Sequence, residues 1–479
     1  MDGCEVVCEI RHHERGTEVH RVDDQADGVS KQSCSRVIAM DGERETGHIR
    51  ERELYEALVR RFGEDCVYLN SKYKRPDGAE KELWDIFVLA LPYAVVFQMK
   101  WRDRSANDFV GERGCVEAKR LDKKMSEAAK QFREFLTLYD NHATIRLPRV
   151  WRQQSGDYEL PLDFIEKIIP VVVIDFDDPD YANPDLRMCL RPRVSDVSNR
   201  VKPFGTVHSF LFKDLLRIVD QMFTIGDLVT YLMKRREMLE TGVAFVQYSE
   251  MDMFALYQTD YPLWEKLVGN SAVVIEPGIF EAKTAKHKEK FAQRQQFFTT
   301  PDLIDGLIDE VVHSDVEDMA CLQNLGRLRL MTSVMKKDVS KVLMQNIRLF
   351  SLPRDAQVCG MRRSIGNYAS EIMPGTYICV VVFNGMPSHM IAVASYCYLR
   401  TLRRIEELQK KGEAKEVFII MVSAITPASY VELKQILDED YGLAPSQEEI
   451  EASRFDCSER KVKASEWGYL EDNRVRGLE

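Results

Sequence analysis

The apolar positions in the first half of the chain follow helical and strand-like spacings. An apolar stripe at helical intervals predicts a helix over residues 51–62, and a short apolar run predicts a strand over 66–70. Two continuous apolar runs flank Pro92 and predict a hairpin. Later stretches predict a helix over 121–139, strands over 168–175 and 207–212, and helices over 213–222 and 225–239. This order of elements predicts a mixed β-sheet flanked by helices.

The pattern changes in the second half. Thr300-Pro-Asp is a good start for a helix, and residues 316–347 form one long helical stretch. Strands are predicted over 377–383 and 417–424 with a helix over 388–411 between them, which indicates a second α/β domain. The predicted fold class is α/β. The predicted segments are a flexible N-terminal extension (1–45), a first domain (46–245), a helical and α/β domain of unknown role (246–445) and a charged tail (446–479).

Three polar side chains interrupt the apolar hairpin. Asp85 opens its first run, and Gln98 and Lys100 close its second run. If the chain turns at Leu91-Pro92, positions whose numbers add to about 183 face each other, which pairs Asp85 with Gln98. Lys100 then lies one diagonal step away. Because an unpaired charge is costly to bury on an apolar face, we expect a metal, a substrate or a mutual ion pair at this point.

Composition narrows the class of protein. The chain has 479 residues, of which 45% are hydrophobic and 30% charged, as expected of a soluble globular protein with two to three domains. No apolar run reaches the roughly 18 residues of a membrane span, and the first residues do not resemble a signal peptide. The eleven cysteines include no Cys-x-x-Cys pair. We therefore expect a reduced, cytoplasmic protein without a membrane partner.

The distribution of charge points to a local rather than a general affinity for nucleic acid. A formal net charge of −11 argues against broad coating of nucleic acid. Cations nevertheless crowd the segment that follows the hairpin. The candidates for phosphate binding in that segment are Arg102, Arg104, Lys119, Arg120 and Lys123.

The hairpin residues suit the hydrolysis of a phosphodiester with a divalent cation. Bound Mg²⁺ activates water and offsets growing negative charge, and it prefers a few oxygen ligands with several waters. Asp85 offers a carboxylate and Gln98 a carbonyl oxygen, so these two residues are the candidate ligands of Mg²⁺ or Mn²⁺. Glu53 or Glu56 can reach in from the preceding helix. Lys100 can orient the attacking water or stabilise the charged transition state.

A helical Glu followed by Asp and then Gln-x-Lys on an apolar strand resembles the PD-(D/E)XK, or restriction-endonuclease-like, nuclease superfamily over residues 48–140. The resemblance implies a mixed-sheet core flanked by helices. It implies that the catalytic residues are Glu53, Asp85, Gln98 and Lys100, with metal held by Asp85 and Gln98. The residues with implied supporting roles are Glu56, Glu82, Lys124 and Gln131. Gln98 occupies the second ligand position of the family motif, where either Glu or Gln occurs, so the chain resembles the Gln-x-Lys variant.

These observations lead to one main hypothesis and several alternatives. The main hypothesis is a metal-dependent endonuclease that acts on DNA rather than RNA, with defence against foreign nucleic acid suggested by the fold alone. The alternatives are a noncatalytic interaction protein with the same fold, an RNA-directed nuclease, and a structural ion pair between Asp85 and Lys100. The C-terminal domain is expected to bind a protein partner, sense a ligand or form a homo-oligomer.

Two other segments have a structural and a functional interpretation. The acidic run 175–180 follows a predicted strand and is expected to be a solvated loop rather than a metal site. The aromatic residues and methionines of 248–261 are expected to pack in a core or between domains rather than to stack on bases.

Overall fold

The computed structural model describes the larger part of the chain between residues 42 and 351 and a few segments outside it. The described residues are 5–7, 42–74, 80–101, 127–128, 131–132, 137–139, 141, 143–148, 157–175, 195–196, 206–240, 244–245, 250–259, 264, 272–273, 278–286, 288–313, 319–351, 360–367, 376–384 and 416–423.

The larger sheet has 8 strands in the order β6-β5-β2-β3-β4-β7-β9-β8. Its strands are β2 (Val67–Lys74), β3 (Glu80–Ala90), β4 (Tyr93–Trp101), β5 (Thr144–Pro148), β6 (Asp157–Pro161), β7 (Lys167–Asp175), β8 (Ser195–Asp196) and β9 (Thr206–Leu211). Strands β2 to β6 pair with one another in antiparallel fashion, whereas β4, β7 and β9 run parallel. The predicted mixed sheet is therefore confirmed.

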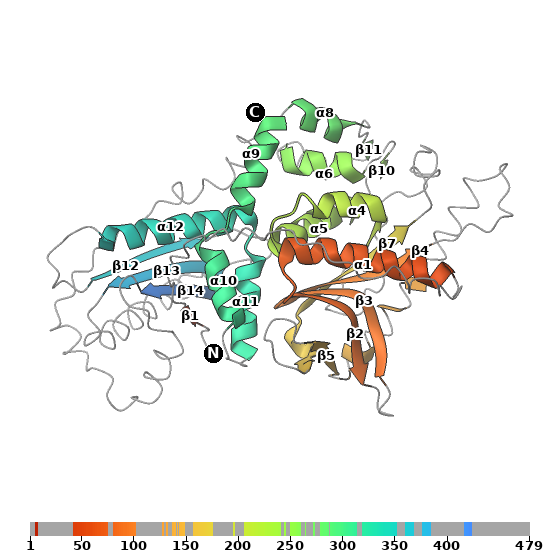
Figure 1. Cartoon of the computed structure of the whole chain (residues 1–479), viewed down its shortest axis with the longest axis horizontal. Helices are drawn as coiled ribbons and strands as arrows, with labels where there is room; N and C mark the ends of the chain where they lie inside the picture. Colours follow the sequence, from red (N-terminus) through yellow and green to blue (C-terminus); the bar gives the residue numbers. More distant parts are fainter. Residues whose placement is uncertain are drawn as a thin grey trace, which may run out of the picture.

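Three helices lie over one face of this sheet: α1 (Gly42–Phe62), α4 (Phe212–Val219) and α5 (Ile225–Glu240) (Figure 1). The predicted apolar stripe of α1 faces the sheet, with Leu54 and Leu58 fully buried. Gly63 ends this helix with a φ of 96°, a left-handed conformation that favours glycine, and its N–H donates to the Val59 carbonyl at 2.8 Å.

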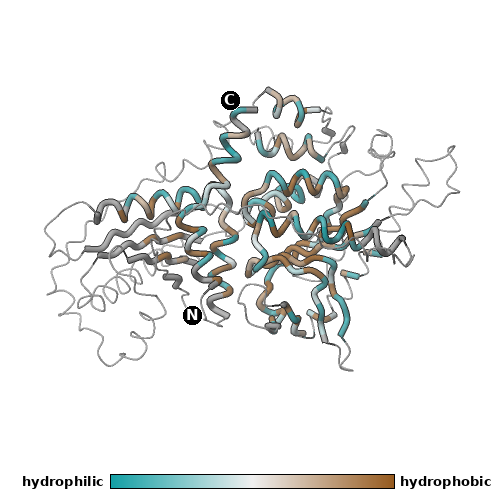
Figure 2. The backbone as a smooth tube through the Cα atoms, in the orientation of Figure 1, coloured by the Kyte–Doolittle hydropathy of each residue, from teal (hydrophilic) through white to brown (hydrophobic). Residues whose placement is uncertain are grey.

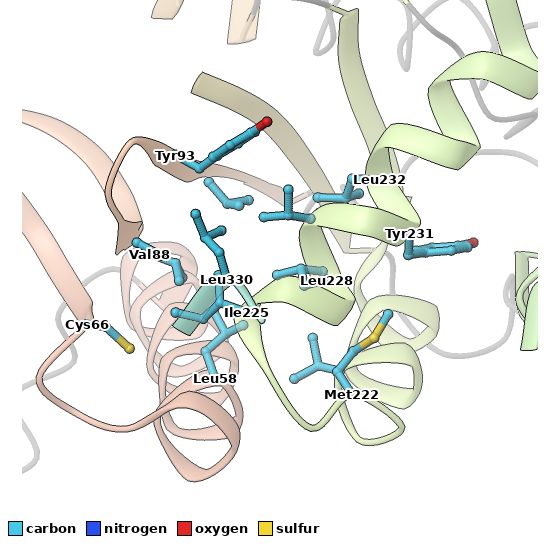
Figure 3. Close-up of a cluster of buried hydrophobic side chains, with 14 of the residues drawn as sticks. Leu58, Cys66, Val88, Tyr93, Met222, Ile225, Leu228, Tyr231, Leu232 and Leu330 are labelled. Atoms are coloured by element: carbon cyan, nitrogen blue, oxygen red, sulfur yellow. The ribbon is translucent and has the colours of Figure 1, made fainter. Parts of the chain in front are cut away.

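Apolar side chains cover both faces of the larger sheet. On the side of α1, Leu58, Val88, Ile225 and Leu330 meet in one cluster (Figure 3). The second cluster lies on the opposite face and includes Phe132. Phe132 belongs to the helix predicted over 121–139, and the described residues between 127 and 139 are helical. Figure 2 shows the resulting hydrophobic colouring of the central strands.

A second sheet has 4 strands in the order β1-β14-β13-β12. Its strands are β1 (Glu5–Val7), β12 (Gly360–Asn367), β13 (Thr376–Asn384) and β14 (Glu416–Ser423). Strands β13 and β14 run parallel, as the predicted strand–helix–strand unit requires, while the helix predicted over 388–411 lies outside the described residues. Helix α12 (Ser333–Ser351) packs against β13 (Figure 1).

The other elements are short or helical. They are η1 (Leu162–Phe164), β10 (Ala244–Phe245), α6 (Glu250–Thr259), β11 (Ala272–Val273), α8 (Ile279–Lys286), α9 (Lys288–Thr299), α10 (Leu303–His313) and α11 (Met319–Leu330). In α6, the side chains of Met251, Met253 and Phe254 are buried. The packing interpretation of this segment is therefore confirmed for those residues.

Two predictions need correction. Residues 5–7 form β1 and pair with β14 in parallel, so the segment 1–45 is not only an extension. The helical stretch predicted over 316–347 is two helices, α11 and α12, which are separated at Met331 and Thr332. The Thr332 hydroxyl accepts the Met335 N–H at 3.4 Å, and the Ser333 N–H donates to the Asp227 carboxylate at 3.0 Å. Thr332 thus caps the start of α12 with its hydroxyl, and Asp227 accepts a second N–H of the first turn.

Helix α11 joins the turn of the β3–β4 hairpin to the rest of the core (Figure 1). A Cβ added at Gly326 would lie 2.2 Å from the Leu91 carbonyl oxygen, so the helix backbone and the turn are in direct contact. Arg329 forms a buried ion pair with Asp65, which follows α1. Among the described helices, none combines the length and the apolar character needed to cross a membrane.

Candidate functional site

The candidate site lies where β3 and β4 separate. The hairpin pairs Ile86 with Phe97 and Ala90 with Tyr93, so the predicted register about Leu91-Pro92 is confirmed. Pairing between the two strands ends at Ile86 and Phe97, whereas β4 remains paired with β7 as far as Trp101. The strands therefore form a fork, and Asp85 is the first residue of β3 beyond the paired part.

The Asp85 carboxylate lies between the separated strands and accepts hydrogen bonds from β4. The Gln98 side-chain Nε2 donates to Asp85 Oδ1 at 2.8 Å and to Oδ2 at 2.7 Å. The Met99 backbone N–H also donates to Oδ2, at 2.5 Å. The carboxylate thus replaces the backbone partner that β4 loses at the fork, and the predicted pairing of Asp85 with Gln98 is observed.

Lys100 lies two residues beyond Gln98 along β4, next to the helical segment that follows the hairpin. Its Nζ donates to Gln131 Oε1 at 2.7 Å. Its positive charge acts on the carboxylates of both Asp85 and Glu51, where it opposes the rise in pKa that burial causes. The structure therefore brings Lys100 and Gln131 together at this site.

The acid that α1 directs to the site is Glu51 rather than Glu53 or Glu56. Glu53 is exposed and forms an ion pair with Arg50 at 2.7 Å, and Glu56 is also exposed. Glu51 is 6% exposed, and its charge raises the pKa of Asp85. Helix geometry explains this correction. Glu51 precedes Leu54 by three residues on the buried face, whereas Glu53 and Glu56 lie on the opposite face.

Glu82 stands at the outer edge of the site on β3. Its side chain is exposed, and its charge raises the pKa values of both Glu51 and Asp85. Asn70 on β2 adopts a left-handed φ of 52° beside a register shift in the β2–β3 pairing. With its amide nitrogen turned toward these acceptors, Asn70 donates to Glu82 Oε1 at 2.6 Å and to the Asp85 carbonyl at 3.2 Å.

Three acids and one lysine thus share a small region at the strand ends. Burial raises the pKa of Asp85 to about 7; Glu51 and Glu82 add to this increase, while the Met99 N–H and Lys100 oppose it. Burial also raises the pKa of Glu51, with Glu82 adding to the effect and His48 and Lys100 opposing it. Such a concentration of negative charge favours a cation at this place.

Arg50 fixes the start of α1 to the sheet beside the site. Its Nε donates to Asp175 Oδ2 at 2.9 Å, its Nη1 donates to Glu53 at 2.7 Å, and its guanidinium lies 5.1 Å from the centre of the Phe212 ring. Asp175 is 7% exposed, so the solvated-loop interpretation is wrong for this first residue of the acidic run. The rest of that run lies outside the described residues.

The donor set suits a hard divalent cation that keeps water ligands. Asp85 and, after rotation of its amide, Gln98 present adjacent oxygen donors, and Glu51 on α1 is a buried carboxylate whose charge acts on Asp85. Across the described part of the chain, no group of three or more His, Cys, Asp or Glu side chains is arranged to hold a metal ion. A site with one or two carboxylates fits Mg²⁺, which is bound in this way, better than it fits structural zinc.

The other predicted site residues lie outside the described residues. They are Lys124, Arg102, Arg104, Lys119, Arg120 and Lys123. Their participation in the site stays a prediction.

Comparisons with known proteins add no assignment to this geometry. No protein-family model, curated protein or solved structure matches the chain.

Proposed function

We propose that the protein is a metal-dependent nuclease that hydrolyses phosphodiester bonds of DNA, with its active site in the fork between β3 and β4. The observation that carries the proposal is the direct bonding of Asp85 to Gln98 with Lys100 on the same strand and Glu51 acting on Asp85. The resemblance to PD-(D/E)XK nucleases supports it, because the same residue types occur there in the same order.

Each residue has a role that follows from its surroundings. Asp85 and Gln98, with Glu51, would hold Mg²⁺ or Mn²⁺, and the bound ion would activate water and neutralise charge on the phosphate. Lys100 keeps its ammonium group at the strand end through its bond to Gln131. At that position it orients the attacking water or stabilises the negative charge of the transition state. Glu82 adds negative charge that strengthens cation binding.

A cleavage assay with full-length protein tests the proposal. Duplex DNA, single-stranded DNA and RNA are incubated with Mg²⁺ or Mn²⁺ and with wild-type protein, Asp85→Asn or Lys100→Met. The control is Lys72→Met, which removes a lysine from an exposed position of the same sheet, where Lys72 lies 3.8 Å from Glu80. We expect cleavage of DNA by wild type and the control, and a loss of about a hundredfold or more in the two site variants.

The other outcomes distinguish the alternatives. Cleavage of RNA alone would identify an RNA-directed nuclease. Equal cleavage by the wild type and both site variants would refute the site. A folded wild-type protein that cleaves none of the substrates would support the noncatalytic interaction protein.

A further inference from the structure

The side-chain amide of Gln98 faces Asp85 with its nitrogen. Nε2 lies within 2.8 Å of both carboxylate oxygens, and the residue is only 5% exposed. This orientation follows from charge, because a carboxylate accepts hydrogen bonds from an N–H group and repels a carbonyl oxygen. In this state Gln98 is the hydrogen-bonding partner of Asp85.

A metal ligand needs the opposite orientation. A divalent cation bound to Asp85 repels the amide NH₂ and attracts the amide carbonyl. Half a turn about the Cγ–Cδ bond exchanges the two groups, and torsions of this sp³–sp² type are only broadly restrained. The Met99 N–H donates to the same carboxylate from the backbone of β4, and this bond does not involve the Gln98 side-chain amide.

We propose that the Gln98 amide turns over when a divalent cation binds, replacing its two hydrogen bonds to Asp85 with a bond from Oε1 to the metal. This inference rests on the proposed function, because it takes the metal site to be at Asp85. It gives one residue two successive roles: Gln98 satisfies the acid in the metal-free chain and ligates the ion in the metal-bound chain.

Two substitutions of similar size separate these roles. Gln98→Glu removes the N–H donors and supplies a permanent oxygen ligand with a negative charge. Gln98→Met keeps the length of the side chain but removes both the donors and the oxygen. With Mn²⁺ and isothermal titration calorimetry, we expect the Gln98→Glu variant to bind at least about tenfold more tightly than wild type, because ligand charge sets affinity. We expect the Gln98→Met variant to bind roughly tenfold more weakly.

Crystals of the full chain with and without Mn²⁺, located by its anomalous scattering, give the direct test. The expected result is a Gln98 oxygen at bonding distance from the ion in the Mn²⁺ crystals, and the bond between Nε2 and Asp85 in the metal-free crystals. Mn²⁺ on Asp85 with Gln98 still hydrogen-bonded to the carboxylate would overturn the inference and leave the proposed metal site intact. Equal Mn²⁺ binding by wild type and Asp85→Asn would overturn both.

Discussion

Replacement of Asp85 by asparagine should change how the stability of the protein depends on pH. Burial and the neighbouring acids raise the pKa of Asp85 from an ordinary value of 3.8 to about 7 in the folded chain. Between these two values the folded protein holds a proton that the unfolded chain has released. The free energy of unfolding therefore falls as pH rises through this window, and the loss is complete above about pH 7.

The magnitude follows from the difference between the two pKa values. A difference of this size corresponds to about 4 kcal/mol, of which roughly 2–3 kcal/mol falls between pH 5 and pH 8. The asparagine side chain of the variant does not ionise, so this part of the pH dependence should disappear. The Asp85→Asn variant should gain stability relative to wild type as pH rises.

Urea denaturation in the presence of EDTA, followed by tryptophan fluorescence, measures this effect at pH 5 and pH 8. EDTA removes divalent cations, which would stabilise the ionised acid at the higher pH. The control is Asp163→Asn, which removes an exposed carboxylate on η1. If wild type and Asp85→Asn lose the same free energy of unfolding between the two pH values, the buried, proton-binding state of Asp85 is refuted.

Three further predictions concern packing and charge. Gly326→Ala should destabilise the protein by about 1–3 kcal/mol in urea denaturation, because the new methyl group meets backbone atoms of the hairpin turn. The control is Gly306→Ala, whose methyl group has no other atom within 4 Å and which should be neutral or stabilising. Glu51→Gln should weaken Mn²⁺ binding in calorimetry while Glu53→Gln should not; the opposite order would restore the first assignment of the helix acid. Arg235 on α5 is fully buried and forms an ion pair with the buried Glu250 on α6 at 2.9 Å. Arg235→Met should destabilise the protein by about 3–5 kcal/mol in thermal or urea unfolding, because the Glu250 carboxylate stays buried without its cation. A smaller loss would mean that water replaces the guanidinium.

Local patterns in the sequence were sufficient for the hairpin. Two apolar runs around Leu91-Pro92 fix the register, and the strand period then determines that Asp85 and Gln98 share a face. The same local reasoning predicted α1, β7, β9, α4 and α5 because each has a strong apolar pattern, although α1 begins at Gly42 and not at the predicted residue 51. These elements contribute to the larger core together with the hairpin strands and helices α6, α10, α11 and α12.

The buried acid of α1, Glu51, could have been found from the apolar pattern of the helix. Leu54 and Leu58 define the buried face of α1, and one turn back along that face is Glu51. A charged residue at an apolar position was the available signal. Glu53 fits the order of residues in the nuclease motif, but its side chain is exposed and forms an ion pair with Arg50.

Other features depend on contacts between distant parts of the sequence. Arg50 and Asp175 are 125 residues apart, and their bond exists only because α1 crosses the end of β7. Strand β12 has few apolar positions and is recognisable as a strand only through its pairing with β13. Gly326 is indistinguishable from an ordinary helical glycine until the hairpin turn is placed against it. Periodicity contains no information about such pairings.

The neutral residue at position 98 is consistent with the charges around it. Glu51, Glu82 and Asp85 already place three carboxyl groups near Lys100, and burial, with a smaller contribution from the neighbouring acids, raises the pKa values of Glu51 and Asp85. A fourth carboxylate would increase this repulsion whenever the metal is absent, while the glutamine supplies N–H donors that satisfy Asp85. The expected compromise is a fold that is stable without a divalent cation and binds one less tightly than a glutamate variant. The Gln98→Glu substitution should therefore lower stability in EDTA and raise it in saturating Mn²⁺, and a variant less stable than wild type under both conditions would contradict this account of the glutamine.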